Sequence, residues 1–145
     1  MKWFPVLFVL SSVALGQRPV SRSVYVFPMA AGLDQYLASQ ITQDHVMQVV
    51  ADPKLADTVL TDRLGEAFEQ SLAKLHPRDE DPDDSEAPHH SFRSSGTKGT
   101  VFLVDAKSRE VIWSDYEKPA RTVSGKSLNR RAERLAKKLQ AMAGK

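Results

Sequence analysis

Residues 99–118, GTVFLVDAKSREVIWSDYEK, decide how this chain folds. They contain two apolar runs, 101–104 and 111–113, separated by the polar segment 105–109. Connections of three to five residues are common between antiparallel strands, so the stretch predicts a β-hairpin. Because successive strand residues face opposite sides, both faces of this hairpin are apolar, and both need cover from the rest of the chain.

A hairpin with Asp105 at the turn and Trp113 near its exit also resembles one blade of a quinoprotein-type propeller. A propeller needs several such blades in a ring. The pattern occurs once here, and no repeat with a period of roughly 20 to 50 residues is visible. The hairpin is therefore predicted to complete a mixed sheet together with other strands of the same domain.

Three further segments predict strands: 23–27 within SVYVFPM, 45–50 (HVMQVV) and 58–61 (TVLT). In the first, valines alternate with Tyr25 and Phe27, which makes both faces apolar and indicates an interior strand. Pro28 cannot donate a backbone hydrogen bond and should end this strand. Asp52 followed by Pro53 is typical of a short helical turn before the third strand.

Three segments have helical periodicity. The apolar stripes are Leu33, Tyr36, Leu37 and Ile41; then Leu64, Phe68, Leu72 and Leu75; then Leu128, Ala132, Leu135, Leu139 and Met142. We expect Thr61 or Asp62 to cap the second helix and Ser127 to cap the third. Together the segments predict an α/β (α+β) fold over residues 23–76 and 99–143. It is a single domain whose mixed four- to five-stranded sheet is packed by three helices, in the order β-α-β-β-α-β-β-α.

The runs VYVFPM…LDQYLASQI and VVADPKLADTVLTDRLGEAF resemble the start of the small periplasmic α/β domains of the CsgG-like proteins and the TolB N-terminal domain. In that group an Ala-Asp step precedes a strand, as Ala56-Asp57 precedes TVLT here. GTVFLVDAKSREVIWS resembles the hairpin at the edge of their sheet. This chain has Asp62 where the group usually has Gly, and it has no lipid-bearing Cys. The resemblance implies an envelope assembly or binding domain that performs no catalysis.

The N-terminus, MKWFPVLFVLSSVALGQR, predicts a secretory signal peptide over residues 1–16. Lys2 precedes an apolar stretch, and Ala14 and Gly16 occupy the small-residue positions before a cleavage site, so cleavage is expected before Gln17. The alternative is a membrane anchor, but the stretch is shorter than the roughly 20 residues of a spanning helix. We therefore expect a periplasmic or secreted chain that does not span the membrane after cleavage, with residues 17–22 as a lead-in.

The composition excludes several kinds of covalent link, metal site and partner. The chain has 145 residues, a formal net charge of +2 and no cysteine. Disulfides, thiol chemistry and thiolate zinc sites are therefore excluded. The nearly neutral charge and the expected export argue against a nucleic-acid partner, and no cofactor is expected.

Residues 77–98 have no hydrophobic periodicity and predict a mobile acidic and Ser-rich loop. Their potential cation ligands are Asp79, Asp81, Asp83, Asp84, His89 and His90. The spacing fails a calcium loop, because Pro82 interrupts it and the turn glycine and final glutamate are absent. We expect weak cation attraction and no metal site.

The last predicted helix is strongly basic. Its candidate contacts to a polyanion are Arg130, Arg131, Arg134, Lys137 and Lys138. The alternatives are a packed helix with a solvated basic face, and pairing of these bases with acidic segments of the same chain or of a second copy.

Nothing in the sequence carries a recognised catalytic motif, and His45 and His76 each stand alone. Trp113 and Tyr116 are expected to be packing residues. The sequence favours an exported, non-enzymatic accessory or binding module of the bacterial cell envelope. It would recognise an envelope protein or an anionic polymer through a sheet edge or the basic helix. The alternative is a secreted hydrolase or a metal-dependent enzyme with an unrecognised site.

Overall fold

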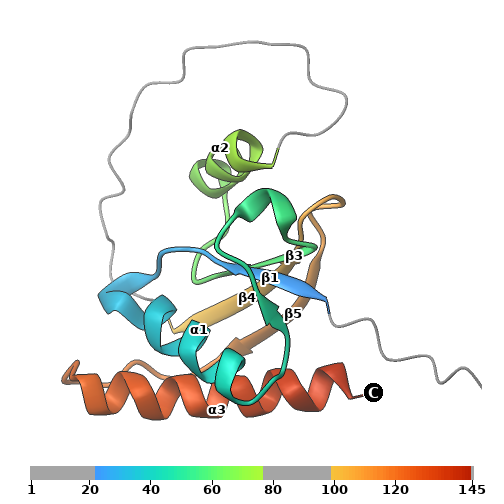
Figure 1. The fold of residues 1–145 in the computed structure, drawn as a ribbon. Helices are drawn as coiled ribbons and strands as arrows, with labels where there is room; N and C mark the ends of the chain where they lie inside the picture. Colours follow the sequence, from blue (N-terminus) through green and yellow to red (C-terminus); the bar gives the residue numbers. More distant parts are fainter. Residues whose placement is uncertain (1–21, 77–98, 145) are drawn as a thin grey trace, which may run out of the picture.

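A computed structural model describes residues 22–76 and 99–144. Within them the strands and helices follow the predicted order (Figure 1). The elements are β1 (Ser23–Val26), η1 (Ala30–Gly32), α1 (Leu33–Gln43), β2 (Gln48–Val49), η2 (Pro53–Leu55), β3 (Thr58–Thr61), α2 (Glu66–Leu75), β4 (Thr100–Asp105), β5 (Val111–Tyr116) and α3 (Gly125–Ala143). The predicted signal peptide and the predicted loop at 77–98 lie outside the described residues.

The five strands form one mixed sheet in the order β2-β1-β3-β4-β5. β1 is parallel to both β2 and β3, whereas β3–β4 and β4–β5 are antiparallel. The central strands are buried on both faces, as their continuous apolar runs predict: Val24, Val59 and Leu60 are fully buried. The predicted α/β fold class is therefore confirmed.

The helices cover the two faces of the sheet unequally. In Figure 1, α1 and α3 lie on one face and the shorter α2 lies on the other. The larger core is on the α1–α3 side and includes Leu37, Leu103 and Leu135. The smaller core gathers Phe68 and Leu72 of α2 against Phe27, Val59 and Val104. The alternation expected at β1 is confirmed, since Val24 belongs to the larger core and Phe27 to the smaller.

β5 contains a β-bulge. Leu103 pairs with Trp113, but the next residue of β4, Val104, pairs with Val111, so Ile112 is the extra residue. Ile112 and Trp113 consequently both pack against the core on the α1–α3 side, where strict alternation would have placed them on opposite faces. The sequence predicted the hairpin but not this bulge.

Two helix starts differ from the prediction. α2 begins only at Glu66, after Gly65 at φ +119°, and Leu64 remains 45% exposed. Asp62 does not cap α2, because its carboxylate accepts hydrogen bonds from the Ala30 N–H at 2.8 Å and from Arg63 Nε at 3.0 Å. α3 is capped by Ser124 in a reciprocal capping box with Ser127, which was predicted to be the cap.

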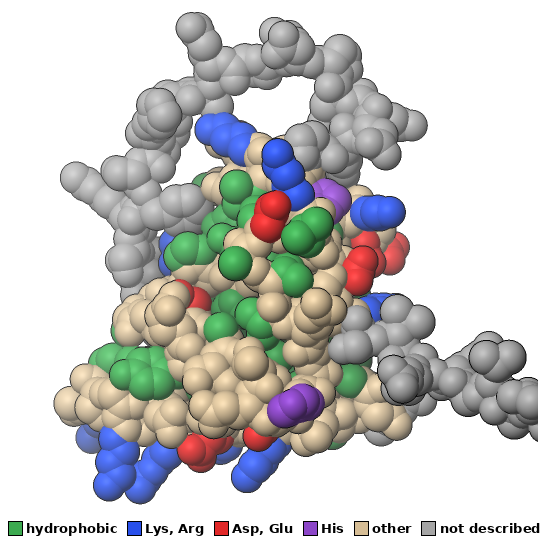
Figure 2. All heavy atoms as spheres, in the orientation of Figure 1, with side chains coloured by type: hydrophobic (Ala, Val, Ile, Leu, Met, Phe, Trp, Pro, Cys, Tyr) green, Lys and Arg blue, Asp and Glu red, His purple; other side chains and the backbone are tan. Residues whose placement is uncertain are grey.

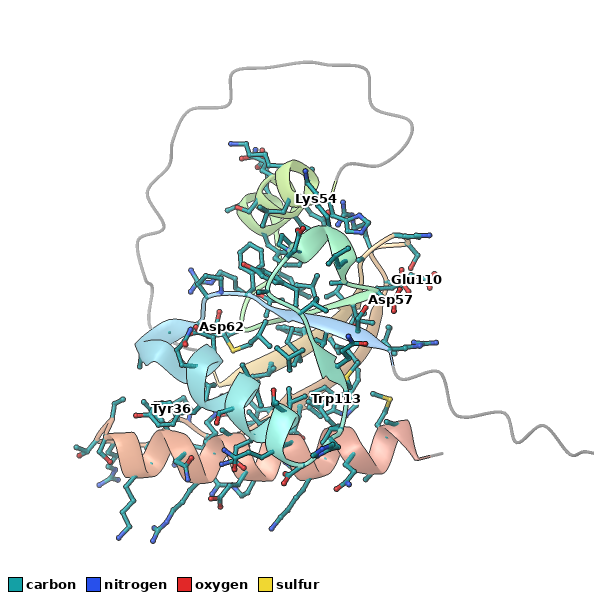
Figure 3. The ribbon with its side chains drawn as sticks, in the orientation of Figure 1. Tyr36, Lys54, Asp57, Asp62, Glu110 and Trp113 are labelled. Atoms are coloured by element: carbon teal, nitrogen blue, oxygen red, sulfur yellow. The ribbon has the colours of Figure 1, made fainter. Side chains whose placement is uncertain are left out.

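The Ala56-Asp57 step fastens the beginnings of β1 and β3 to each other. The Asp57 carboxylate accepts from the Ser23 N–H at 3.1 Å and lies 2.9 Å from the Ser23 hydroxyl, which in turn accepts from the Asp57 N–H at 2.9 Å. Asp57 immediately precedes β3 and Asp62 immediately follows it, so the two carboxylates form their hydrogen bonds at opposite ends of this strand (Figure 3).

Among the described residues, no helix has both the length and the apolar character that crossing a bilayer requires.

Candidate functional site

β5 is the longer edge of the sheet. It is bonded to β4 on one side and, in the described part of the chain, to no strand on the other. The opposite edge, β2, has two residues, whereas β5 has six. A strand with one free side presents a row of backbone donors and acceptors to any extended chain that approaches it.

The hydrogen-bonding register shows which residues of β5 face outward. Glu117 N–H donates to the Gly99 carbonyl oxygen at 3.0 Å, in line with the Val101–Asp115 and Thr100–Tyr116 pairings. Hydrogen-bonded and non-hydrogen-bonded pairs alternate along an antiparallel ladder. The backbone groups of Asp115 therefore point toward β4, and those of Ser114 and Tyr116 point toward the open edge.

Two aromatic side chains flank this edge and behave differently. Trp113 is half-buried and points from β5 toward α3, as expected of a packing residue (Figure 3). Tyr116 was also expected to pack, and that expectation is wrong: it is 63% exposed. It lies on the α2 side of the sheet, and α2 covers the middle of that face, packing on Phe27, Val59 and Val104 rather than on the edge strand. The regular part of the edge, from Trp113 to Tyr116, thus has a half-buried aromatic ring on one face and an exposed one on the other.

The basic residues of α3 meet acidic residues of the hairpin. Asp115 and Glu117 are two residues apart and lie on the same side of the hairpin. Arg131, Arg134 and Lys138 are three and four residues apart and share one side of α3. Arg134 Nε donates to Glu117 Oε1 at 2.9 Å, Lys138 Nζ donates to Asp115 Oδ2 at 2.7 Å, and Arg131 Nη2 donates to the Gly99 carbonyl at 2.9 Å.

These contacts shift the ionisation of the paired groups. Burial raises the pKa of the Glu117 carboxyl, but the hydrogen bond and charge of Arg134, with the charges of Lys138 and Arg131, outweigh burial, so this pKa lies below its ordinary value. The hydrogen bond to Glu117 raises the pKa of Arg134, and the hydrogen bond to Asp115 raises that of Lys138. Glu117, Arg134 and Lys138 are therefore charged at neutral pH.

These ion pairs divide the five residues of the predicted polyanion contact into a paired group and an exposed group. Arg131, Arg134 and Lys138 bind acids of the sheet, with Arg134 and Lys138 still half-exposed. Arg130 and Lys137 are exposed and form no ion pair with any described residue. With about 3.6 residues per turn, Arg131, Arg134 and Lys138 lie on the side of α3 opposite Asn129, whose Oδ1 accepts from Gln40 of α1. Arg130 and Lys137 lie about a quarter turn from Asn129, on the side of α3 opposite its buried residues. Figure 2 shows Lys and Arg side chains projecting from the molecule over α3.

Groups for metal or acid–base chemistry do not come together in residues 22–76 and 99–144. No three His, Asp or Glu side chains there are arranged to hold a metal ion. His45 Nδ1 lies 2.9 Å from the Gln43 carbonyl in a local turn, and His76 ends α2. The acidic run at 79–90, considered as a cation ligand, lies outside the described residues.

Sequence reasoning named the five bases and the hairpin, and missed that the edge strand β5 lies beside the basic helix. The signal available in the sequence was residue spacing. Asp115 and Glu117, two residues apart on or next to a strand, share one side of it, and bases three and four residues apart on a helix share one side of that helix. What the arrangement offers chemically is recognition, through outward-facing backbone amides bordered by a basic helix.

Comparisons with known proteins leave the family of this chain open: no family model, no curated protein and no solved structure matches it.

Proposed function

We propose that this protein is an exported, non-enzymatic binding module of the bacterial cell envelope that takes up an extended polypeptide as an additional strand along β5. The observation that carries the proposal is the outward orientation of the backbone groups of Ser114 and Tyr116 on a free six-residue edge. Strand addition derives its affinity from main-chain hydrogen bonds and its selectivity from alternate side chains.

The bulge at Ile112 limits where a partner can bind. A bulge disrupts the ladder locally and twists the strand, and proteins use it to prevent uncontrolled pairing of edges. On β5 it affects the beginning of the strand and leaves Trp113–Tyr116 regular. A partner strand would therefore pair with this second half, next to the exposed Tyr116 ring.

Two features of the sequence support the cellular setting of the proposal. The N-terminal 16 residues have the pattern of a signal peptide, and the arrangement of strands and helices resembles domains that assemble or bind envelope proteins. The strand-adding role of β5 does not depend on either feature and is tested separately.

The test is a selection of displayed random peptides on the full chain, followed by binding assays with Ser114→Pro and Ser114→Ala. Proline removes the outward N–H of Ser114 and leaves the ladder to β4 intact, since edge strands accept proline where the N–H faces solvent. Alanine keeps the N–H and is the matched control. We expect the selected peptides to bind the wild-type chain and Ser114→Ala but not Ser114→Pro.

A second measurement does not rely on a variant. Hydrogen exchange at the amides of Ser114 and Tyr116 should slow when a selected peptide is added, while exchange at the Asp115 amide, already directed to β4, should change little. Peptides that bind Ser114→Pro as tightly as wild type and leave both outward amides unprotected would overturn strand addition at β5.

A further inference from the structure

We infer that the outward side of α3 is a docking surface for an anionic phospholipid membrane, on which the domain lies with α3 between the lipid and the sheet. This inference goes beyond the proposed strand addition at β5 and does not depend on it. It is carried by the direction in which bases of α3 project and by the uneven distribution of charge between α3 and the rest of the described chain.

Three exposed bases form a straight basic ridge on α3: Lys126, Arg130 and Lys137. At about 100° per residue they lie within about 40° of one another around the helix and extend over about 16 Å of its length. They lie opposite the buried side of α3, which packs on the sheet and on α1. None of the three forms an ion pair with a residue that the structure describes.

The basic ridge faces away from the body of the domain. α3 runs along the outside of the molecule, with the sheet and α1 on its inner side (Figure 1). Lys and Arg side chains project from α3 on the side away from the sheet (Figure 2). Because the bases of the ridge point in one direction from a convex surface, all three can reach a flat charged surface at the same time.

Two charged residues flank the basic ridge. Glu133, the one acid of α3, is half-buried and accepts a hydrogen bond from Asn129 Nδ2 at 2.9 Å. Arg134 is paired with Glu117 but remains 56% exposed. When both acids are counted against the ridge and Arg134, positive charge is still in excess on the outward side of α3.

The same imbalance extends over the whole described domain. Residues 115–144 contain eight Lys or Arg and three Asp or Glu. The other described residues, 22–76 and 99–114, contain six Lys or Arg and nine Asp or Glu. The domain is therefore positive on the α3 side and negative elsewhere. An anionic surface attracts the first part and repels the second, which orients the domain with α3 toward that surface.

The shape of the ridge favours a membrane over a defined soluble ligand. Such a ligand is held in a concave site by converging polar groups, and a convex ridge does not provide one. Headgroups of anionic lipids attract clustered Lys and Arg side chains without a shaped site. None of the exposed large apolar side chains of the described residues belongs to α3. We therefore expect contact at the level of the headgroups, without the burial of apolar side chains seen for interfacial helices.

The test is co-sedimentation of the chain with lipid vesicles. It uses the expected mature chain beginning at Gln17, which keeps every described element, because an apolar N-terminal segment would enter a bilayer by itself. The vesicles contain either phosphatidylcholine alone or an equimolar mixture of phosphatidylcholine and phosphatidylglycerol. We expect binding to the anionic vesicles only, and release from them as salt is added.

Two triple variants with the same change in net charge test the location of the contact. Lys126→Gln, Arg130→Gln, Lys137→Gln should weaken binding to anionic vesicles about fivefold for each base removed. The matched control replaces three exposed lysines of η2, α2 and the turn between β4 and β5: Lys54→Gln, Lys74→Gln, Lys107→Gln. Lys54 lies at the end of the molecule opposite α3 (Figure 3), and the control should bind nearly as well as wild type.

A second measurement reports the orientation of the bound domain. The chain has no cysteine, so a single introduced cysteine can carry a fluorescent label. Ala141→Cys places the label on the outward side of α3, and Ala73→Cys places it on an exposed position of α2. On anionic vesicles that contain a headgroup-labelled quencher lipid, fluorescence from position 141 should be quenched more strongly than fluorescence from position 73.

Each alternative outcome is decisive. Equal weakening in the two triple variants, equal quenching at the two labelled positions, or equal binding to neutral and anionic vesicles would overturn the docking surface. A wild-type chain that ignores anionic vesicles but binds sulfated dextran through the basic ridge would make the partner a soluble polymer and would also overturn it. Ser114→Pro should bind vesicles as wild type does, so the failure of this inference and the failure of strand addition are distinguishable.

Discussion

Glu117 and Arg134 form a bidentate ion pair that joins the hairpin to α3. Arg134 Nε donates to Glu117 Oε1 at 2.9 Å and Arg134 Nη2 donates to Glu117 Oε2 at 3.1 Å. The Glu117 side chain is 13% exposed, and Lys138 and Arg131 also lie within 4 Å of it. This geometry makes Glu117 the acid that holds three bases of α3 beside the open edge of the sheet.

Replacing Glu117 by Gln should lower the free energy of unfolding by about 1 kcal/mol at pH 7, since a bidentate pair in a charge network exceeds an ordinary surface pair. The pKa of Glu117 is lowered in the folded chain. Its contribution is therefore fully present above the unfolded value of about 4.5 and is lost as the pH falls through the folded value. Urea unfolding between pH 7 and pH 3 should show the difference between wild type and variant shrinking below about pH 4.5.

Glu110→Gln, on the same hairpin, is the matched control because Glu110 is exposed and its side chain makes no ion pair with the described residues. It should leave stability unchanged across this pH range. A difference between wild type and Glu117→Gln that stays constant down to pH 3 would mean that Glu117 contributes packing and not charge.

Ser23 is the residue on which the junction between β1 and β3 depends. Its hydroxyl accepts from the Asp57 N–H and lies 2.9 Å from both the Leu55 carbonyl oxygen and the Asp57 carboxylate, to either of which it can donate, and its own N–H donates to the Asp57 carboxylate. Ser23→Ala should destabilise the chain by about 1–3 kcal/mol, because a backbone donor loses its partner in a nearly buried site. Thermal unfolding would measure this. Ser71→Ala is the control and should be close to neutral, because the Ser71 hydroxyl donates to the Ala67 carbonyl of its own helix and joins no two strands.

Gly99, which precedes β4, allows the backbone there to approach Glu117, which follows β5. Its φ is +89°, and a Cβ at this position would clash with the Glu117 carbonyl oxygen. Gly99→Ala should cost about 3 kcal/mol or more, combining left-handed strain with the clash. Gly32→Ala separates the two causes, because Gly32 has φ +75° but open space around its Cα. It should cost only about 1 kcal/mol in urea unfolding. Equal losses in the two variants would show that the clash is relieved.

Much of this fold is contained in local sequence patterns. The strand at TVLT coincides with Thr58–Thr61, and the apolar stripe from Leu33 to Ile41 lies on the buried face of α1. Both patterns show which side chains are buried, and this depends on the apolar or polar character of each residue along the segment. The order of the strands was not predictable, because alternation shows that a strand has two apolar faces but not which strands lie beside it.

The same limit explains the residues whose roles were misassigned. Asp62 has the chemistry of a helix cap, but the loop after the parallel neighbour β1 brings the Ala30 N–H within 2.8 Å, a contact between residues 32 apart. Tyr116 has the pattern of a packing residue, yet it lies on an edge strand at a face that α2 leaves uncovered there. The sequence places the basic residues on the last helix, whereas their division into paired and exposed groups depends on how α3 docks beside β5.

The predicted signal peptide implies where the mature protein is found and which residue begins it. Expressed in a bacterium with its own N-terminus, the chain should be recovered from the periplasm or medium with Gln17 as its first residue. We expect the small residues Ala14 and Gly16 to direct this cleavage. N-terminal sequencing measures this, and Ala14→Arg should block processing. Recovery of the wild-type chain only from the cytoplasm, with Met1 retained, would contradict export.

Arg109 connects the turn of the hairpin to the end of α2. It adopts φ +65°, and its Nη2 donates to the His76 carbonyl oxygen at 2.8 Å, while its Nε lies 3.9 Å from Glu69. A cation at a helix C-terminus is favoured by the helix dipole. Arg109→Ala should therefore destabilise the chain by about 2 kcal/mol, and Arg109→Lys should recover only part of that loss, because lysine keeps the charge but not the planar guanidinium group.

Hydrogen exchange should show α2 opening first in both variants, since α2 is the shortest of the three helices. If instead the amides of β1 and β3 lose protection together with α2, the turn and the sheet unfold as one unit and Arg109 stabilises the whole domain.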